Sequence, residues 1–264
     1  MPKTILITGA TDGIGLETAR MLAKQGHVLL LHGRNQSKLD IVKEQLSDSP
    51  ASLQIYRADL SDLSDVQALA KAIADDHKHL DILINNAGIY RTNKPRLQGG
   101  MDVRFMVNTI APFALTKALL PIIPKDGRII NLSSAAQAMV SIKAMMGEEP
   151  IVDMPAYAQS KLAITMWTSH LAQQHPDGPL FVSVNPGSLL ATKMVKEGFG
   201  VEGSDISIGA DILCRAALTD EFQGKSGQYY DNDTKRFAPP QADGSDMAKA
   251  ARITETIEAI IAQA

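Results

Sequence analysis

The stretch "KTILITGATDGIG", residues 3–15, decides the fold of this chain. Residues 3–8 are mostly apolar or β-branched and predict a strand, and the pattern from about residue 13 to 25 predicts a helix. The turn between them is rich in glycine. Such a turn lets the backbone approach a pyrophosphate, and the start of the helix supplies free N–H donors to the anion.

The same alternation of strand and helix continues along the chain. Helical patterns lie at about 36–47 and 62–77, and further helices separate the later strands. Apolar stretches of strand length occur at 27–32, 52–58, 80–86, 127–133 and 180–186. Strands that are apolar throughout and alternate with helices are typical of a parallel sheet covered on both faces. We therefore predict one α/β domain over residues 1–264, a doubly wound Rossmann-type parallel sheet of about seven strands with helices on both faces.

The composition limits the possible partners. Hydrophobic residues make up 45% of the 264, charged residues make up 21%, and the net charge of −3 gives no basic surface for nucleic acid. The single cysteine, Cys214, excludes a disulfide framework and a cysteine-based metal cluster. We expect no metal site, because His77 and His79 are two residues apart and do not share a helical face. The short N-terminus does not resemble a signal peptide and we see no apolar run of about 18 residues, so we expect a cytoplasmic protein without a membrane span.

Two regions break the regular alternation, and we expect both to be structureless loops. They lie at about 135–155 and 188–206, and each follows a predicted strand. Ligands of open α/β sheets bind beyond the carboxyl ends of the strands, so we predict that these two loops face the substrate.

The turn at residues 8–15, "TGATDGIG", is the first candidate cofactor site. Gly9, Gly13 and Gly15 follow the spacing G-x-x-x-G-x-G, which differs from the usual Rossmann spacing G-x-G-x-x-G. The alternative is a glycine-rich turn that binds nothing. The predicted cofactor contacts in this turn are Gly9, Thr11, Asp12, Gly13, Ile14 and Gly15.

The residue after the second strand bears on the choice of cofactor. An acidic side chain there would accept hydrogen bonds from the ribose hydroxyls of NAD(H), whereas this chain has Gly33 and then Arg34. A guanidinium suits a 2′-phosphate, so NADP(H) is favoured over NAD(H). The alternative is an ordinary solvated loop arginine. Asp12 would repel the same phosphate unless it pairs with Arg34.

Tyr157 and Lys161 in "YAQSK" are the candidate catalytic pair. They are four residues apart, so they share one face if the segment is helical. An ammonium beside a phenol lowers the phenol pKa, because the positive charge favours the phenolate. Tyr157 could then exchange a proton near neutral pH. The spacing alone also occurs on many surface helices.

Seven motifs in order resemble the short-chain dehydrogenase/reductase family in its compact single-domain form. They are "TGATDGIG" (8–15), "ADL" (58–60), "NNAG" (85–88), "FMVNTIAPFALTKALLP" (105–121), "INLSS" (130–134), "YAQSK" (157–161) and "NPG" (185–187). The long spacer after "NLSSAA" is most similar to the branch of retinol dehydrogenases and protochlorophyllide reductases.

The resemblance implies a role for each matching residue. Tyr157 would donate the proton to a carbonyl or accept it from an alcohol, Lys161 would bind the nicotinamide ribose, and Asn108 would hold a relay water. Asp59 would contact adenine. The further cofactor contacts implied by the motifs are Leu60, Asn86, Ala87, Gly88, Pro186 and Gly187. A homo-oligomer through the helices that bear Asn108 and Tyr157 is also implied.

Two assignments leave an alternative open. Ser134 matches the family serine that holds the substrate oxygen, and Ser133 would point to the other face of the strand, although a strand ending one residue early would reverse them. The family threonine after "NPG" corresponds in position to Ala191. We expect Thr192 to take its role through one extra loop residue; otherwise the contact is lost.

The implied chemistry is hydride transfer between a nicotinamide and a carbonyl carbon, with no metal. Methionine packs adaptably against irregular apolar shapes, and the spacer at 135–155 is rich in it, so we predict an apolar carbonyl or alcohol substrate. The alternatives are an NAD-dependent alcohol dehydrogenase and a nucleotide-sensing protein that has lost catalysis. All four candidate catalytic groups are present, which favours the enzyme.

Overall fold

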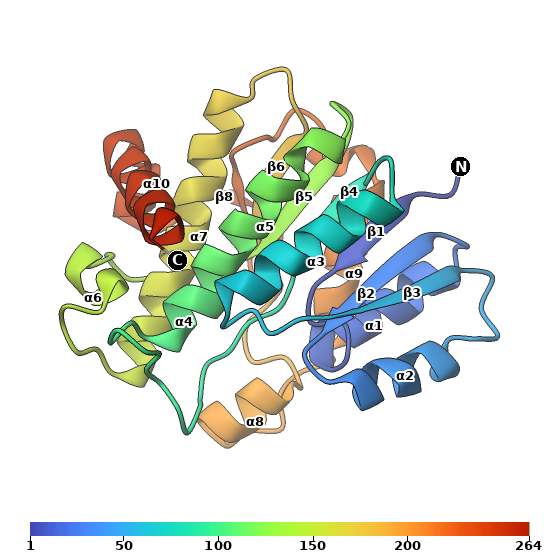
Figure 1. The fold of residues 1–264 in the computed structure, drawn as a ribbon, viewed down its shortest axis with the longest axis horizontal. Helices are drawn as coiled ribbons and strands as arrows, with labels where there is room; N and C mark the ends of the chain where they lie inside the picture. Colours follow the sequence, from blue (N-terminus) through green and yellow to red (C-terminus); the bar gives the residue numbers. More distant parts are fainter. Residues whose placement is uncertain (264) are drawn as a thin grey trace.

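One eight-stranded sheet organises the structure, a computed structural model that describes residues 1–263, so the last residue of the predicted 1–264 domain lies outside it. Its strand order is β3-β2-β1-β4-β5-β6-β7-β8 (Figure 1). The strands are β1 (Thr4–Ile7), β2 (Val28–Gly33), β3 (Ser52–Arg57), β4 (Ile82–Asn85), β5 (Arg128–Leu132), β6 (Leu180–Asn185), β7 (Tyr229–Asp231) and β8 (Arg236–Ala238). The prediction of a doubly wound Rossmann-type sheet is confirmed.

The last two strands differ from the prediction of about seven parallel strands. β7 continues the parallel sheet beside β6, but β8 returns antiparallel beside β7, so the sheet is mixed and has eight strands. Each of the two strands has only three residues and carries a charged one. Neither therefore has the continuous apolar run by which the sequence identifies a buried parallel strand.

Helices cover both faces of the sheet (Figure 1). The longer helices are α1 (Gly13–Ala23), α2 (Gln36–Gln45), α3 (Leu63–Asp76), α5 (Ala111–Leu119), α7 (Asp153–Gln174), α9 (Ser207–Leu218) and α10 (Met247–Ala262). Shorter helical segments are α4 (Val103–Phe105), η1 (Met106–Ile110), η2 (Leu120–Ile122), α6 (Ile142–Met146), α8 (Lys193–Phe199), η3 (Asp220–Phe222) and η4 (Ala242–Ser245). Helix α1 packs against α9, and α3 packs against α5.

Two apolar cores lie on opposite faces of the sheet because neighbouring strand residues point in opposite directions. In β1, Leu6 joins the core beneath α3, α5 and α7, whereas Ile5 and Ile7 join the core beneath α1 and α9. All three side chains are fully buried. This double burial explains why the strands are apolar throughout rather than alternating.

Helix α10 packs along α7, the helix that bears Tyr157 and Lys161 (Figure 1). Ala250, Ile253 and Ile257 of α10 belong to the same buried core as the apolar residues of α7. Helix α10 therefore shares one apolar core with α7. The homo-oligomer implied by the resemblance stays a prediction.

The two regions predicted as structureless loops each contain a helix, so that part of the prediction is wrong. In the region 135–155, Ser141 caps the start of α6, and its hydroxyl accepts the N–H of Ala144. In the region 188–206, Thr192 caps α8 in the same way, and its hydroxyl accepts the N–H of Val195. Both helices are shorter than two full turns, too short for a helical period to be visible in the sequence.

The segment Val103–Ile122 is long and apolar enough to cross a membrane, which contradicts the expectation that no run approaches this length. It consists of α4, η1, α5 and η2 in succession. Within the fold, 67% of its most apolar window is buried against other parts of the chain. The interior position of the segment accounts for its apolar composition.

Candidate functional site

The turn between β1 and α1 has the geometry that a dinucleotide needs. Gly9 and Gly13 have φ angles of +68° and +58°, in the left-handed region that favours glycine. A β-carbon at Gly15 would collide with the Asn86 amide and the Gly9 carbonyl. The Asn86 amide donates to the carbonyls of Thr8 and Gly9, at 2.8 and 3.2 Å. The predicted contacts of the turn and of the segment 86–88 are therefore brought together at the switch point between β1 and β4, and they fit a dinucleotide.

The buried side chain of His32 hydrogen-bonds this turn, a role that the sequence analysis missed. Its Nδ1 accepts the N–H of Gly9 at 3.3 Å, and its Nε2 lies 3.1 Å from the carbonyl of Ala58. The first contact requires an unprotonated Nδ1, so Nε2 carries the proton. Burial lowers the pKa of His32 to about 4, so the ring is neutral and holds both segments at neutral pH.

Arg34 and Asp12 do not form the ion pair that the sequence left open. Arg34 is exposed after β2, and among residues 1–263 no carboxylate is within ion-pair distance of it. The carboxylate of Asp12 instead accepts the N–H of Gly13 at 2.8 Å and caps α1. The carboxylate is therefore engaged at the helix start, and the guanidinium is available to an anion.

Hydrogen bonds within the turn after β3 hold Asp59 in place. The Asp59 carboxylate accepts the N–H and the hydroxyl of Ser61, at 2.9 and 2.8 Å, which fixes its orientation. The Leu60 side chain is buried in the core, and the cofactor contact at this residue stays a prediction. Thr11 packs against Gly33, because a β-carbon added at Gly33 would come within 2.6 Å of the Thr11 methyl group.

Asn108 lies in η1, a π-helical turn inside the apolar helix, and is fully buried. Its Oδ1 accepts the N–H of Ile89 at 2.8 Å, and its Nδ2 donates to the carbonyl of Ile89 and to Ser160 Oγ, both at 3.0 Å. Asn108 thus ties the segment after β4 to α7. π-helical turns occur frequently at functional sites, and no sequence pattern indicated this one. The relay water implied by the resemblance stays a prediction.

Tyr157 and Lys161 share one face of α7, as predicted. Lys161 is 4% exposed, its Nζ donates to the carbonyl of Leu132 at 2.7 Å, and the Nζ lies 5.7 Å from the centroid of the Tyr157 ring. Burial lowers the pKa of Lys161 to about 8. The structure thus places an ammonium that loses its proton easily beside the phenol.

The proton affinity of Tyr157 differs from the sequence expectation. Burial raises the pKa of the phenol, and the neighbouring Ser134 hydroxyl only partly opposes that rise. The expected lowering by Lys161 does not dominate, because burial removes the phenolate from water and so disfavours the charged form. Tyr157 is therefore a protonated phenol at neutral pH, suited to donating a proton.

Ser134, and not Ser133, lies beside the phenol. The Ser133 hydroxyl is buried and bonds the carbonyl of Lys161 and the hydroxyl of Thr165, at 2.9 and 2.7 Å. The Ser134 hydroxyl accepts the N–H of Ala136 at 3.1 Å and interacts with Tyr157. The two neighbouring serines therefore point to opposite sides, one into the protein and one into the site.

A cavity of about 250 Å³ opens at this point. Ser134, Tyr157, Gly187 and Thr192 line it, and the contact of Thr192 with the nicotinamide stays a prediction. The predicted cofactor contact Ile14 also lines it. Further apolar lining residues were missed by the sequence analysis, namely Tyr90, Leu189, Leu190, Met194 and Val195. Most of them lie in the segment 188–206, where the only signal was its position after β6.

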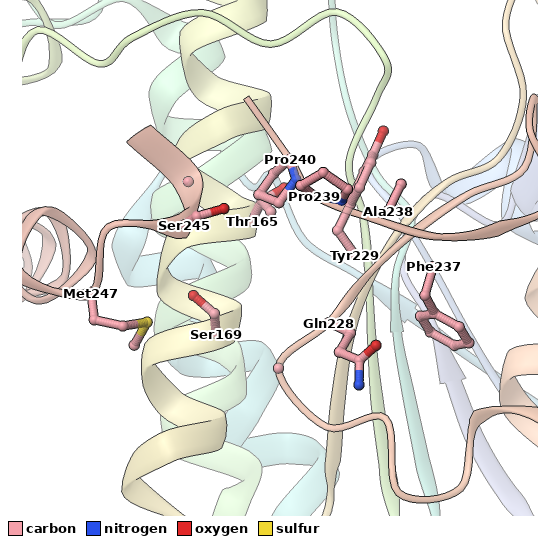
Figure 2. Close-up of a pocket in the computed structure, with 12 residues that line it drawn as sticks. Thr165, Ser169, Gln228, Tyr229, Phe237, Ala238, Pro239, Pro240, Ser245 and Met247 are labelled. Carbon is pink, nitrogen blue, oxygen red and sulfur yellow. The ribbon is translucent and has the colours of Figure 1, made fainter. Parts of the chain in front are cut away.

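A second cavity, of about 380 Å³, lies between α7 and the β7–β8 hairpin (Figure 2). Tyr229 lines it, and the Tyr229 hydroxyl donates to the carbonyl of Ser134 at 3.1 Å. No charged side chain lines this cavity within the described part of the chain. It therefore offers no site for a dinucleotide phosphate. Residues 1–263 also contain no cluster of three histidine, cysteine or acidic side chains that could hold a metal.

The chain matches the family model for short chain dehydrogenase over residues 3–200. Retinol dehydrogenase 11 of Homo sapiens is 29% identical, in an alignment that covers 94% of this chain and 82% of that protein. Retinol dehydrogenase 12 of Mus musculus is 31% identical, in an alignment that covers 89% of this chain and 79% of that protein.

A similar architecture occurs in a solved structure. The crystal structure of a short chain dehydrogenase from Shigella flexneri 2a str. 301, complexed with NADP, superposes with a TM-score of 0.69. The two chains are 27% identical, and the superposition covers 87% of this chain and 96% of the other. The motif order, the fold and the site geometry therefore agree with one another.

Proposed function

Because the chain belongs to the short-chain dehydrogenase/reductase family of NAD(P)-dependent oxidoreductases, we propose that it is an NADPH-dependent carbonyl reductase or alcohol dehydrogenase for apolar substrates. One observation carries the proposal. Ser134 and the protonated Tyr157 line one cavity, with Lys161 behind the phenol and the glycine-rich turn beside it.

The bound nicotinamide would supply the hydride in reduction and accept it in oxidation. The chain's own residues would hold the substrate oxygen and move the proton. Ser134 would hydrogen-bond the carbonyl oxygen, and the Tyr157 hydroxyl would donate its proton to that oxygen as negative charge develops there. Lys161, held at the Leu132 carbonyl, would stabilise the resulting phenolate through its ammonium.

The preference for NADP(H) rests on three features at the ends of the first strands. Thr11 packs against Gly33, the strand end carries no acidic side chain, and the exposed Arg34 can pair with a 2′-phosphate. Asp12 is held at the start of α1, which turns its carboxylate toward the helix N–H groups. The NADP complex of a related dehydrogenase supports the same preference.

The apolar substrate class rests on the cavity lining. Leu190, Met194 and Val195 line the cavity together with Ser134 and Tyr157, and none of its described lining residues carries a charge. Exposed apolar side chains also flank the segments on this edge, including Met139, Val152 and Leu189. An apolar aldehyde, ketone or secondary alcohol fits this lining better than a charged metabolite.

The test is the Tyr157→Phe variant, assayed with NADPH on a panel of apolar aldehydes and ketones and with NADP⁺ on the matching alcohols. We expect the variant to bind the cofactor as the wild type does and to lose turnover by at least about a hundredfold. Unchanged turnover in the variant would remove Tyr157 from the mechanism. Cofactor binding by the wild type without turnover on the whole panel would favour a sensing protein instead.

A further inference from the structure

Arg104 is a fully buried arginine with every guanidinium nitrogen engaged. Its Nη1 donates to both carboxylate oxygens of Asp102, at 3.0 and 2.8 Å. Its Nε donates to the carbonyl of Tyr90, and its Nη2 donates to the carboxylate of Asp153. A buried charge is costly unless it is paired and fully hydrogen-bonded, so such an arrangement requires an explanation.

These contacts join three elements that carry the candidate site. Asp102 caps α4, which leads directly into the π-helical turn with Asn108. Tyr90 lies in the segment that follows Asn86–Gly88, and Asp153 is the first residue of α7. Helices α4 and α7 lie next to one another (Figure 1). Arg104 thus connects the Asn108 helix, the segment after β4 and the helix of Tyr157 at one point.

Two of the hydrogen-bond partners of Arg104, Asp153 and Tyr90, lie next to Tyr157 in the fold. Asp153 precedes Tyr157 by four residues, so the two lie on the same face of α7, one turn apart. The Tyr90 ring packs edge-on against the Tyr157 ring, with 5.3 Å between the centroids. A displacement of about 1 Å at a reacting group can cost about a hundredfold in rate. The position of the phenol is therefore sensitive to both contacts.

We propose that Arg104 is a positioning residue, which holds the start of α7 and the Tyr90 segment in register so that the Tyr157 hydroxyl faces the substrate oxygen. This role rests on the proposed function of Tyr157. Lysine could not replace the arginine, because one ammonium cannot reach three acceptors in the plane of a guanidinium fork. The hydrogen-bond partners of Arg104 are Tyr90, Asp102 and Asp153, and none of these is a predicted cofactor contact, so this role predicts an effect on kcat rather than on cofactor binding.

The link to Asp153 is the one to break. Replacing Arg104 would leave Asp102, whose side chain is 4% exposed, as an unpaired buried charge, and the variant could fail to fold. The Asp153 side chain is 51% exposed, so the loss of its carboxylate is tolerable. Asp153→Ala removes the acceptor, whereas Asp153→Asn keeps an oxygen acceptor at the same place. Asp62→Ala, which removes the side-chain cap of helix α3, is the matched control for weakening a helix start, because α3 packs against α5 and bears no candidate catalytic residue.

We expect Asp153→Ala to lower kcat at least tenfold with an unchanged KM for NADPH, and Asp153→Asn to stay within about threefold of the wild type. Asp62→Ala should retain the wild-type kcat. Amide hydrogen exchange should become faster at residues 153–158 in Asp153→Ala only. A kcat within twofold of the wild type in Asp153→Ala, or equal losses in the alanine and asparagine variants, would overturn the proposal. If the wild type itself shows no turnover, the proposed function fails. Unchanged hydrogen exchange in Asp153→Ala would then still refute the proposal that the contact between Arg104 and Asp153 holds the start of α7.

Discussion

Replacing Lys161 by methionine should stabilise the folded protein at neutral pH while removing its activity. The Lys161 ammonium is buried, and burial lowers its pKa from 10.5 to about 8. The folded state therefore holds the charged form at a cost. At 1.36 kcal/mol for each pKa unit, the difference of 2.5 corresponds to about 3 kcal/mol at pH 7. Losing the charged hydrogen bond to the Leu132 carbonyl offsets about 1.5–3 kcal/mol of this gain.

The pH dependence is the clearer signal. Below pH 8 the lysine is protonated in both states. Between pH 8 and 10.5 the folded state has released the proton and the unfolded state still holds it, so wild-type stability rises with pH across this window. The advantage of Lys161→Met over the wild type should therefore shrink by about 2–2.5 kcal/mol between pH 7 and pH 10.

Urea unfolding at 25 °C without added cofactor measures this difference directly. The exposed Lys125→Met variant controls for replacing a surface ammonium by a thioether. A stability difference between Lys161→Met and the wild type that stays constant from pH 7 to pH 10 would refute the reasoning, because the buried charge would then cost nothing.

Three further outcomes follow from single contacts. Arg34→Ala should weaken NADPH binding roughly tenfold and leave NADH binding unchanged, as measured by fluorescence titration, since it removes one charged contact to a 2′-phosphate. Tyr229→Phe removes one of two donors to the Ser134 carbonyl, the other being Gln137, and should lower kcat about threefold to tenfold at an unchanged cofactor KM. Because the folded pKa of His32 lies near 4 and its ordinary value is 6.5, the unfolded state takes up the proton first, and stability should fall by about 3 kcal/mol as the pH drops through this window. His32→Gln should flatten that acid limb in urea unfolding.

The strands with two buried faces could be predicted from the sequence because continuous apolar runs of this length are typical of buried parallel strands. β1, β2, β4, β5 and β6 lie within two residues of the predicted ranges. The short hairpin of β7 and β8 and the small helices α6 and α8 could not. Their stability comes from the tertiary packing around them, which a local pattern does not contain.

The candidate site divides in the same way. The motif residues Ser134, Tyr157 and Lys161 could be named from the sequence because their order along the chain is specific. Their environment could not, since the rise in the phenol pKa depends on burial that only the fold creates. Arg104 carried no signal at all, because a lone arginine in an apolar helix acquires its role through partners 14 and 49 residues away.

In the proposed reaction, hydride and proton reach one carbonyl group at the place that Ser134 and Tyr157 line. Incubating the wild type with an apolar ketone and NADPH deuterated at C4 of the nicotinamide, on either face, tests it most directly. We expect one deuterium at the carbinol carbon of the product, detected by mass spectrometry, and none with Tyr157→Phe. Reduced product without deuterium from either form of the cofactor, or equal labelling by the variant, would contradict the claim.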